Sequence, residues 1–195
     1  MSKFAADIAR YKAKGNSGHG LWLNPAVWAI AFYRLGNWIN VAKPAWVIRM
    51  PAKIVSSLGN KFCEVFMEMR ISPRADIGDG LYIGHIGGVH IHPDAVIGRN
   101  CDISHNVTIG VAALGRRGVP VLGDNVYVGT GATLVGNIRI GSGVKVGANT
   151  LVISNVPAGA TVMCAPGRVI LAPRTDWPSA EAFSENDAER QRVAL

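Results

Sequence analysis

The sequence holds little charge and few cysteines, and none of its apolar runs is long. Charged residues make up 17% of the chain and hydrophobic ones 49%, which excludes a disordered chain and predicts one compact domain, with or without an appended segment. The longest strongly apolar stretch, PAVWAIAFY, is too short to span a bilayer. The three cysteines lie far apart and outside any metal-ligand spacing, which excludes a disulfide framework. Because the N-terminus also lacks the features of a signal peptide, we expect a cytoplasmic protein with reduced, mostly buried thiols.

Acidic residues are scarce in the first 70 residues. That segment holds ten lysines and arginines against Asp7, Glu64 and Glu68, whereas residues 71–195 hold ten residues of each sign. The net charge of +7 therefore belongs to the N-terminal segment. We expect no nucleic-acid partner, because no recognition motif accompanies the charge. The alternative contacts are an acidic polymer or a membrane surface, and the second would place the protein peripherally at the inner membrane face.

A six-residue repeat organises the chain from residue 71 onwards. Aliphatic residues recur in steps of six, and the position after each of them is usually glycine. Neither an amphipathic helix nor a simple alternating strand has this period. The aliphatic positions are Ile71, Ile77, Ile83, Ile91, Ile97, Ile103, Ile109, Leu122, Val128, Leu134, Ile140, Val146 and Val152.

A period of six is typical of a hexapeptide β-helix, in which every hexad forms one short strand and one corner. The aliphatic residue fills the narrow interior, and glycine relieves the backbone where the chain turns. Three hexads complete one triangular coil, so equivalent residues of successive coils stack at the inter-strand spacing of ~4.8 Å. We therefore predict a β-helix domain over residues 71–170.

Two irregularities interrupt the repeat. Ile83 and Ile91 are eight residues apart, and Ile109 and Leu122 are thirteen apart. The first spacing indicates a two-residue bulge, and the second indicates a protruding loop, GVAALGRRGVPV. Loops on a rigid scaffold commonly carry function.

The segments on either side of the repeat differ from it. Residues 1–70 combine tryptophans and aliphatic residues with Pro25, Pro44 and Pro51 as breakers, which predicts several short helices. These helices either cap the open end of the coil or serve assembly, acceptor binding or membrane contact. Residues 171–195 are polar and predict a C-terminal tail.

The repeat brings together two histidines that are distant in sequence. His85 lies two positions after Ile83, and His105 lies two positions after Ile103, which is three hexads further on. Both should therefore occupy the same corner of adjacent coils. A paired, exposed imidazole suits general base catalysis, because its ordinary pKa lies near the working pH. The simpler interpretation is that both are polar corner residues.

Two further histidines lie close by in the sequence. His92 directly follows the aliphatic Ile91, and His90 falls inside the bulge. Both are interpreted as surface or subunit-interface residues. A zinc site needs three protein ligands that converge, and no acidic or cysteine ligand clearly joins the histidines. We expect no metal, with a zinc-dependent carbonic anhydrase on the same coil as an alternative.

Four stretches within residues 71–170 follow a known pattern: ADIGDGLYIGHIGGVHIHPDAVIG, ISHNVTIG, VLGDNVYVGTGATLVGNIRIGSGVKVGANTLVISNVPAGA and APGRVI. On these stretches the chain resembles the hexapeptide-repeat acyltransferases, specifically their serine acetyltransferase-like branch. The second and third stretches are specific to that branch. A hexapeptide repeat alone would imply only the fold.

The resemblance implies an all-β, left-handed parallel β-helix with an N-terminal α-helical segment, assembled as a homotrimer or a dimer of trimers. It also implies transfer of acetyl from acetyl-CoA to a hydroxyl, with a histidine as base. His85, in LYIGHIGG, matches that histidine, and His105 lies beside it as an orienting residue or a second base. In such a reaction a neutral imidazole takes the alcohol proton, and a backbone N–H stabilises the oxyanion.

The resemblance places acetyl-CoA in a groove between neighbouring coils, where small residues let it approach the backbone. The stretches GTGA and VGAN match those positions, and four basic residues are candidates to meet the phosphates. Each basic residue is equally explained as a solvated surface charge. The small residues are Gly129, Thr130, Gly131, Ala132, Gly147 and Ala148, and the basic ones are Arg116, Arg117, Lys145 and Arg168.

Three departures from the serine-type pattern bear on the acceptor. Arg70 and Gly84 stand where that pattern has aspartates, and Val119 stands where it has a histidine. These changes remove groups that would recognise the ammonium and carboxylate of serine. With His105 in ISHNVTIG, the chain is more similar to the acetyltransferases of bacterial exopolysaccharide and colanic-acid pathways. We therefore expect a sugar or polysaccharide-precursor hydroxyl as acceptor. Serine O-acetylation for cysteine synthesis and a non-enzymatic β-helical scaffold are the alternatives.

Overall fold

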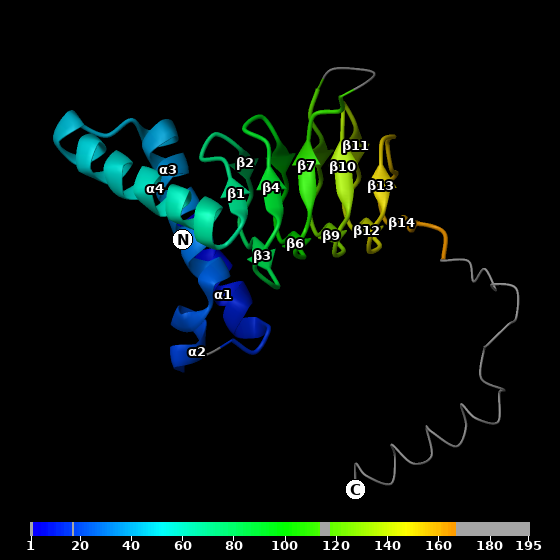
Figure 1. The fold of residues 1–195 in the computed structure, drawn as a ribbon, viewed down its shortest axis with the longest axis horizontal. Helices are drawn as coiled ribbons and strands as arrows, with labels where there is room; N and C mark the ends of the chain where they lie inside the picture. The colour runs from blue at the N-terminus through cyan, green and yellow to red at the C-terminus, as the bar shows by residue number, and fades with distance from the viewer. Residues whose placement is uncertain (1, 17, 114–117, 167–195) are drawn as a thin grey trace, which may run out of the picture. The chain divides into compact units, whose positions relative to one another are not determined.

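The computed structural model describes residues 2–16, 18–113 and 118–166 (Figure 1). The residues up to Cys164 form one compact unit. Four helices come first, and short strands follow them. The helices are α1 (Lys3–Ala13), α2 (Gly18–Leu23), α3 (Pro25–Ala42) and α4 (Trp46–Phe66).

The strands are two or three residues long and pair in parallel. They form three sheets, in the orders β1-β4-β7-β10-β13, β11-β8-β5-β2 and β14-β12-β9-β6-β3. Every third strand belongs to the same sheet, so the chain winds through the three sheets in turn. The strands are β1 (Met69–Ile71), β2 (Asp76–Ile77), β3 (Tyr82–Ile83), β4 (Val89–Ile91), β5 (Val96–Ile97), β6 (Asp102–Ile103), β7 (Thr108–Gly110), β8 (Val121–Leu122), β9 (Tyr127–Val128), β10 (Thr133–Val135), β11 (Arg139–Ile140), β12 (Lys145–Val146), β13 (Leu151–Val152) and β14 (Thr161–Val162).

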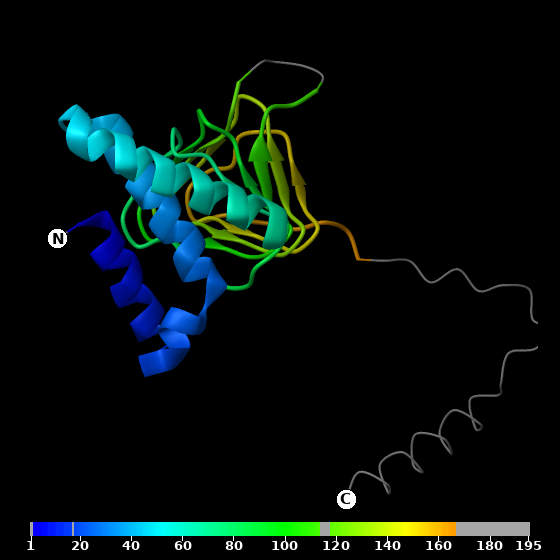
Figure 2. The same cartoon turned by 60° about the vertical axis from the view of Figure 1, so that its left-hand side comes forward.

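This winding confirms the predicted parallel β-helix built from hexapeptide repeats. The aliphatic repeat positions are buried, and the interior also holds the small residues two positions before them, such as Ala75, Ala95 and Val107. In Figure 1 the coils stack one after another, and α3 and α4 lie at the end of the stack that holds β1. Figure 2 shows the helices gathered at that same end.

Asparagine or glycine fills the corners in which the backbone turns left-handed. Asn100, Asn106, Asn125 and Asn149 each lie three positions after an aliphatic repeat residue and have φ between 54° and 58°. Asparagine tolerates this region better than other residues with a side chain, because its short amide bonds to the local backbone. These corners set the direction of each following strand.

The glycines that follow the aliphatic residues serve close coil stacking. A Cβ on Gly78 would lie 2.7 Å from the carbonyl carbon of Gly98 in the next coil, whereas a Cβ on Gly110 meets no described atom within 4 Å. We expect Gly78→Ala to lower the free energy of unfolding by about 1–3 kcal/mol and Gly110→Ala by less than about 0.5 kcal/mol. Urea unfolding of both variants measures the difference. Equal losses would contradict the stacking role.

Both predicted irregularities interrupt the coils. Residues 84–88 connect β3 to β4 and contain Gly87 and Gly88 at positive φ. The longer connection between β7 and β8 includes residues 114–117, which lie outside the described part of the chain. The bulge and the loop therefore fall where the spacing of the repeat predicts them.

The helices agree with the prediction from the sequence except at one proline. Asn24 caps α3 through its side chain, which accepts from the amide of Ala26, and Pro25 occupies the first turn. Pro51, predicted as a breaker, lies inside α4. That prediction was wrong because Pro51 stands in the second turn, where its missing amide removes a single hydrogen bond near the helix start. Within the described ranges, no helix combines the length and apolar content that crossing a membrane requires.

Helices α1 and α3 cap the open end of the coil stack, where β1, β2 and β3 have a strand on one side only. Arg34 donates to the carbonyls of Ile77 and Gly78, and Asp7 accepts from the amide of Leu81. The helices thus satisfy backbone groups that have no strand to pair with, which favours the helical cap among the predicted alternatives. Other side chains that donate to first-coil carbonyls are Lys3, Tyr11, Tyr33, Asn37 and Asn40.

Candidate active site

His85 and His105 lie side by side at one corner of the coil stack. The strands before them pair in register, with Ile83 opposite Ile103, so the two histidines occupy equivalent positions on adjacent coils. Their ring centroids are 5.7 Å apart, and the rings meet edge to face at 80°. The structure therefore brings together the two histidines that the repeat predicts to be neighbours.

The two rings differ in their surroundings. His85 is exposed, whereas His105 is half-buried. The Nδ1 atom of His105 is shielded from solvent and has no hydrogen-bond partner among the described residues. The backbone carbonyl of His105 accepts from the amide of Gly131 in the following coil, so its main chain is fixed. The exposed ring is the one that an acceptor molecule can reach.

Helix α1 holds the strand that leads into His85. The Tyr11 hydroxyl donates to the carbonyl of Ile83 at 2.8 Å and accepts from the amide of the same residue at 3.1 Å. Burial raises the pKa of Tyr11 well above its usual range, so this hydroxyl stays protonated. The Tyr11 ring also packs against Tyr82, with centroids 4.7 Å apart. A buried side chain thus fixes the backbone two residues before His85.

A second attachment joins α1 to the strand that leads into His105. Asp102 accepts from Arg10 at 2.9 Å and from Lys14 at 2.8 Å. The strands before both histidines are therefore fastened to one helix. Sequence reasoning did not find Tyr11, Arg10 or Asp102, because no local motif links residues separated by 72 or 92 positions.

A column of small residues continues from the two histidines along the same corner. The strand pairs β6–β9 and β9–β12 place Thr130 after His105 and then Ala148 after Thr130. The main chain binds these positions together, since Asn149 donates its amide to the carbonyl of Thr130. Cys164 follows next in the column, and its thiol donates to the carbonyl of Ala148. The candidate base and part of the candidate acetyl-CoA site therefore share one edge of the coil stack.

The remaining small residues predicted to admit acetyl-CoA have other surroundings. Ala132 is buried in the interior, so its side chain cannot meet a ligand. A Cβ on Gly129 would lie 2.8 Å from the amide nitrogen of Ala148, so stacking of the coils already requires glycine there. Gly131 has positive φ and Gly147 is half-buried. Lys145 is exposed on β12, while Arg116, Arg117 and Arg168 lie outside the described residues.

His90 and His92 do not join the pair. The prediction that His90 falls inside the bulge was wrong, because the bulge ends at Gly88 and His90 lies on β4, between Arg70 and Thr108 of the neighbouring strands. The Nδ1 atom of His92 accepts from the amide of Asp94, a local turn contact. No group of three histidine, cysteine or carboxylate side chains within residues 2–16, 18–113 and 118–166 could hold a metal ion.

The three cysteines are free, as expected for reduced thiols. Cys63 and Cys101 are buried, and Cys164 is exposed. Burial raises the pKa of Cys101 to about 11, which keeps its thiol protonated and unreactive.

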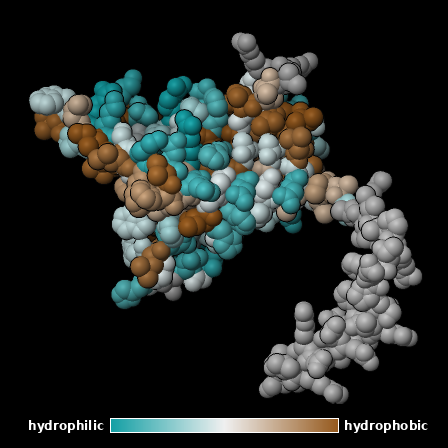
Figure 3. All heavy atoms as spheres, in the orientation of Figure 1, coloured by the Kyte–Doolittle hydropathy of each residue, from teal (hydrophilic) through white to brown (hydrophobic). Residues whose placement is uncertain are grey.

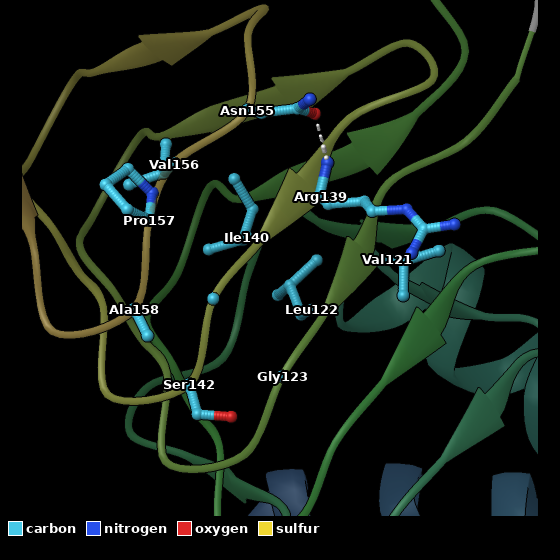
Figure 4. A pocket seen from close by; sticks show the side chains of 11 residues that line it. Val121, Leu122, Gly123, Arg139, Ile140, Ser142, Asn155, Val156, Pro157 and Ala158 are labelled. Atoms are coloured by element: carbon cyan, nitrogen blue, oxygen red, sulfur yellow. Dashed lines mark hydrogen bonds between the residues drawn. The ribbon is translucent and has the colours of Figure 1, made fainter.

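A hollow on a different sheet lacks groups for catalysis. Figure 4 shows it between β8 and β11 and the chain around Val156, with Arg139 donating its backbone amide to Asn155 at 2.8 Å. Its lining is mostly aliphatic, and Arg139 is its single titratable side chain. The histidine pair is therefore the better candidate for chemistry.

Comparisons with known proteins agree with this fold. Residues 120–154 match the family described as bacterial transferase hexapeptide (six repeats). The chain is 35% identical to a serine acetyltransferase of Synechococcus elongatus, over 86% of this chain and 66% of the relative. The chain spans two thirds or less of the curated relatives it matches, down to 24% of a rice protein.

Solved structures of serine acetyltransferases are similar to the chain in both fold and sequence. The serine acetyltransferase of Neisseria gonorrhoeae in complex with serine is 31% identical, with a TM-score of 0.66, over 85% of this chain and 67% of that one. The soybean serine acetyltransferase apoenzyme is 30% identical, with a TM-score of 0.70, over 87% of this chain and 68% of that one. The chain therefore belongs to the hexapeptide-repeat acyltransferases of the serine acetyltransferase type.

Proposed function

We propose that the protein is an acetyl-CoA-dependent O-acetyltransferase in which His85 is the general base. The observation that carries this proposal is the pair of imidazoles in edge-to-face contact, one of them exposed, at the head of a column of small residues. Neutral His85 takes the proton of the acceptor hydroxyl while its oxygen attacks the thioester carbonyl carbon. The carbon–sulfur bond breaks, CoA leaves as the thiolate, and the acetyl ester forms. A backbone N–H stabilises the oxyanion of the intermediate.

His105 acts beside His85 as an orienting residue or second base. The edge-to-face contact of the rings limits the rotation of the exposed His85 side chain. The Nδ1 atom of His105 is shielded from solvent and has no hydrogen-bond partner among the described residues, so this side of the ring is closed to the acceptor.

The corner column supports a binding site for acetyl-CoA. Thr130 and Ala148 follow the histidines in register, and Gly131 and Gly147 adjoin them, so the backbone is accessible to a long, narrow ligand. Lys145 is exposed on β12, the strand that leads into Ala148, and is the described candidate for a phosphate contact. Arg116, Arg117 and Arg168 remain candidates for the same role.

The relatives favour serine as the acceptor over the sugar hydroxyl that we expected. The curated relatives are named serine acetyltransferases, and a solved one is a complex with serine. One observation keeps the sugar as second candidate. Arg70 stands on β1 where the serine-type pattern has an aspartate, and it lies 3.9 Å from Glu64. An exopolysaccharide or polysaccharide-precursor hydroxyl needs no ammonium-binding carboxylate.

We propose a cytoplasmic homotrimer, with a dimer of trimers as the larger assembly, in line with the pattern of the family. Exposed apolar side chains on the coils, among them Val96, Val121 and Tyr127, offer surface for contacts between copies. The protein would lie peripherally at the inner membrane face.

Release of CoA with different acceptors tests the proposal. We expect acetyl-CoA turnover to rise with serine and to stay at the background hydrolysis rate with nucleotide sugars and glycans. Turnover with a glycan but not with serine would make the sugar hydroxyl the favoured acceptor in place of serine. Thermal stabilisation by CoA is expected in either case, because a ligand that binds the native state raises the melting temperature. Absence of both turnover and stabilisation would favour a β-helical scaffold. Stoichiometric zinc in the purified protein would favour the carbonic anhydrase alternative.

A further inference from the structure

His85 follows β3, the edge strand of its sheet. β3 pairs with β6 on one side, where the amide of Tyr82 donates to the carbonyl of Cys101. No strand of the described chain lies on its other side, to which Ile83 turns both its amide and its carbonyl. A buried backbone group without a partner costs free energy comparable to a lost hydrogen bond. The strand that leads into the proposed base therefore needs partners from outside the coils.

Helix α1 supplies those partners. The Tyr11 hydroxyl donates to the carbonyl of Ile83 at 2.8 Å and accepts from its amide at 3.1 Å. One hydroxyl thus makes both bonds that a neighbouring strand would make with this residue. Asp7, one helical turn before Tyr11, accepts from the amide of Leu81 at 2.8 Å. Helix α1 therefore takes the place of a preceding strand along β3.

The contact between α1 and β3 is buried. Tyr11 and Asp7 are 0% exposed, in contrast to the apolar side chains that are exposed along α4 in Figure 3. The Tyr11 ring packs against Tyr82, and Nζ of Lys14 lies 4.5 Å from the centroid of the Tyr82 ring. Because water has no access to this contact, no solvent molecule replaces the two bonds if the Tyr11 hydroxyl is removed.

The backbone of His85 has few attachments of its own. The bulge that holds it, residues 84–88, contains three glycines. The bulge bonds to the next coil at Gly84 and Gly87, whereas the amide and carbonyl of His85 take part in no hydrogen bond with a described residue. The carbonyl of His105, in contrast, accepts from an amide of the following coil. The position of the exposed His85 ring therefore depends on where β3 ends.

We propose that Tyr11 is a positioning residue for His85 and acts through the backbone of Ile83. This inference rests on the proposed role of His85 as general base. Without the hydroxyl, the amide and carbonyl of Ile83 would be buried with no partner, and the end of β3 would relax. A displacement of about 1 Å at a reacting group lowers a rate by up to about 100-fold. Tyr11 is fully buried, so it touches neither the acceptor nor acetyl-CoA.

Tyr11→Phe removes the hydroxyl, keeps the ring and tests the proposal. We expect kcat for CoA release to fall about tenfold, because the base is displaced by less than about 1 Å. KM for acetyl-CoA and thermal stabilisation by CoA should stay unchanged, because the small-residue column is not altered. In a His85→Ala background the same change should lower the residual turnover by less than about twofold, since no ring is left to position. Steady-state CoA release of the wild type, both single variants and the double variant measures this.

Tyr33→Phe is the matched control. Tyr33 is also 0% exposed, and its hydroxyl donates to the carbonyl of Ala75 at 2.9 Å, in the same first coil but before β2. Its loss should also lower the melting temperature but should leave kcat unchanged. An equal fall of kcat in Tyr11→Phe and Tyr33→Phe would overturn the proposal, because it would indicate a general loosening of the helical cap. Wild-type kcat in Tyr11→Phe would overturn it too, as would an effect of Tyr11→Phe that is undiminished without His85.

NMR spectra of the histidine rings separate this inference from the proposed function. The edge-to-face contact of His85 and His105 makes the ring signals of each depend on the position of the other. We expect Tyr11→Phe to move the signals of both rings and to leave that of His92 in place, whereas Tyr33→Phe should move none of the three. If the wild type releases no CoA above background hydrolysis, the proposed function fails, while the ring signals still decide whether Tyr11 positions His85. Unmoved signals of His85 and His105 in Tyr11→Phe would overturn the positioning role.

Discussion

Replacing His85 with alanine is expected to lower kcat/KM for CoA release by roughly 10²–10⁴-fold, the range typical for loss of a general base. His85 is the exposed member of the edge-to-face pair, so its ring is the one that an acceptor hydroxyl can approach. Thermal stabilisation by CoA should stay unchanged, because the substitution removes no group of the small-residue column. The measurement is steady-state release of CoA over a range of acceptor concentrations.

Two further variants distinguish catalysis from disturbance of the corner. His90→Ala changes an exposed histidine on β4, which belongs to another sheet, and should leave turnover close to that of the wild type. His105→Ala should reduce turnover less than His85→Ala, because His105 is half-buried and, in our proposal, acts mainly by orienting His85. Turnover of His85→Ala within a few-fold of the wild type would contradict the assignment of His85 as the general base.

The repeat made the coil and the histidine pair predictable, because both depend on counting along the chain. Each aliphatic position marks one buried strand residue, so the register of adjacent coils follows without knowledge of side-chain contacts. The pairing of His85 with His105 needs only that register. The bulge and the long loop are visible for the same reason, as departures from a step of six.

The attachments of the helices were not predictable in the same way. Asp7, Tyr11 and Arg34 bind backbone groups of the first coil, and a backbone group has no sequence signature. The repeat also does not predict the identity of the acceptor, because that depends on side chains that the corner and the loops bring together. Pro51 shows the limit of local propensity, because packing of α4 against α3 and β1 offsets one missing hydrogen bond.

Breaking the buried ion pair between α1 and α3 is expected to cause the largest loss of stability. Arg34 and Asp7 pair at 2.8 Å, with side chains 6% and 1% exposed. In Arg34→Met, the Asp7 carboxylate would stay buried without its counter-ion, and the carbonyls of Ile77 and Gly78 would lose their donor. The free energy of unfolding should fall by about 3–5 kcal/mol. Urea unfolding measures it.

The loss in Arg34→Met should depend on pH in a defined direction. Burial already raises the pKa of Asp7 above its ordinary value, and Arg34 is the main group that lowers it again. Without Arg34 the native-state pKa rises further, so the charged carboxylate opposes folding increasingly as the pH rises through that value. The stability that Arg34→Met loses relative to the wild type should therefore shrink as the pH falls toward the ordinary aspartate pKa of 3.8.

An exposed pair on the same coil end is the control. Arg74 and Asp94 are 2.9 Å apart, close to the 2.8 Å of the buried pair. Their side chains are 70% and 59% exposed, so Arg74→Met should cost at most about 1 kcal/mol. The double change Arg34→Met/Asp7→Leu should recover part of the loss, because it removes both buried charges together. If Arg34→Met and Arg74→Met lowered stability equally, the α1–α3 cap would owe its stability to apolar packing, and the buried pair would be dispensable.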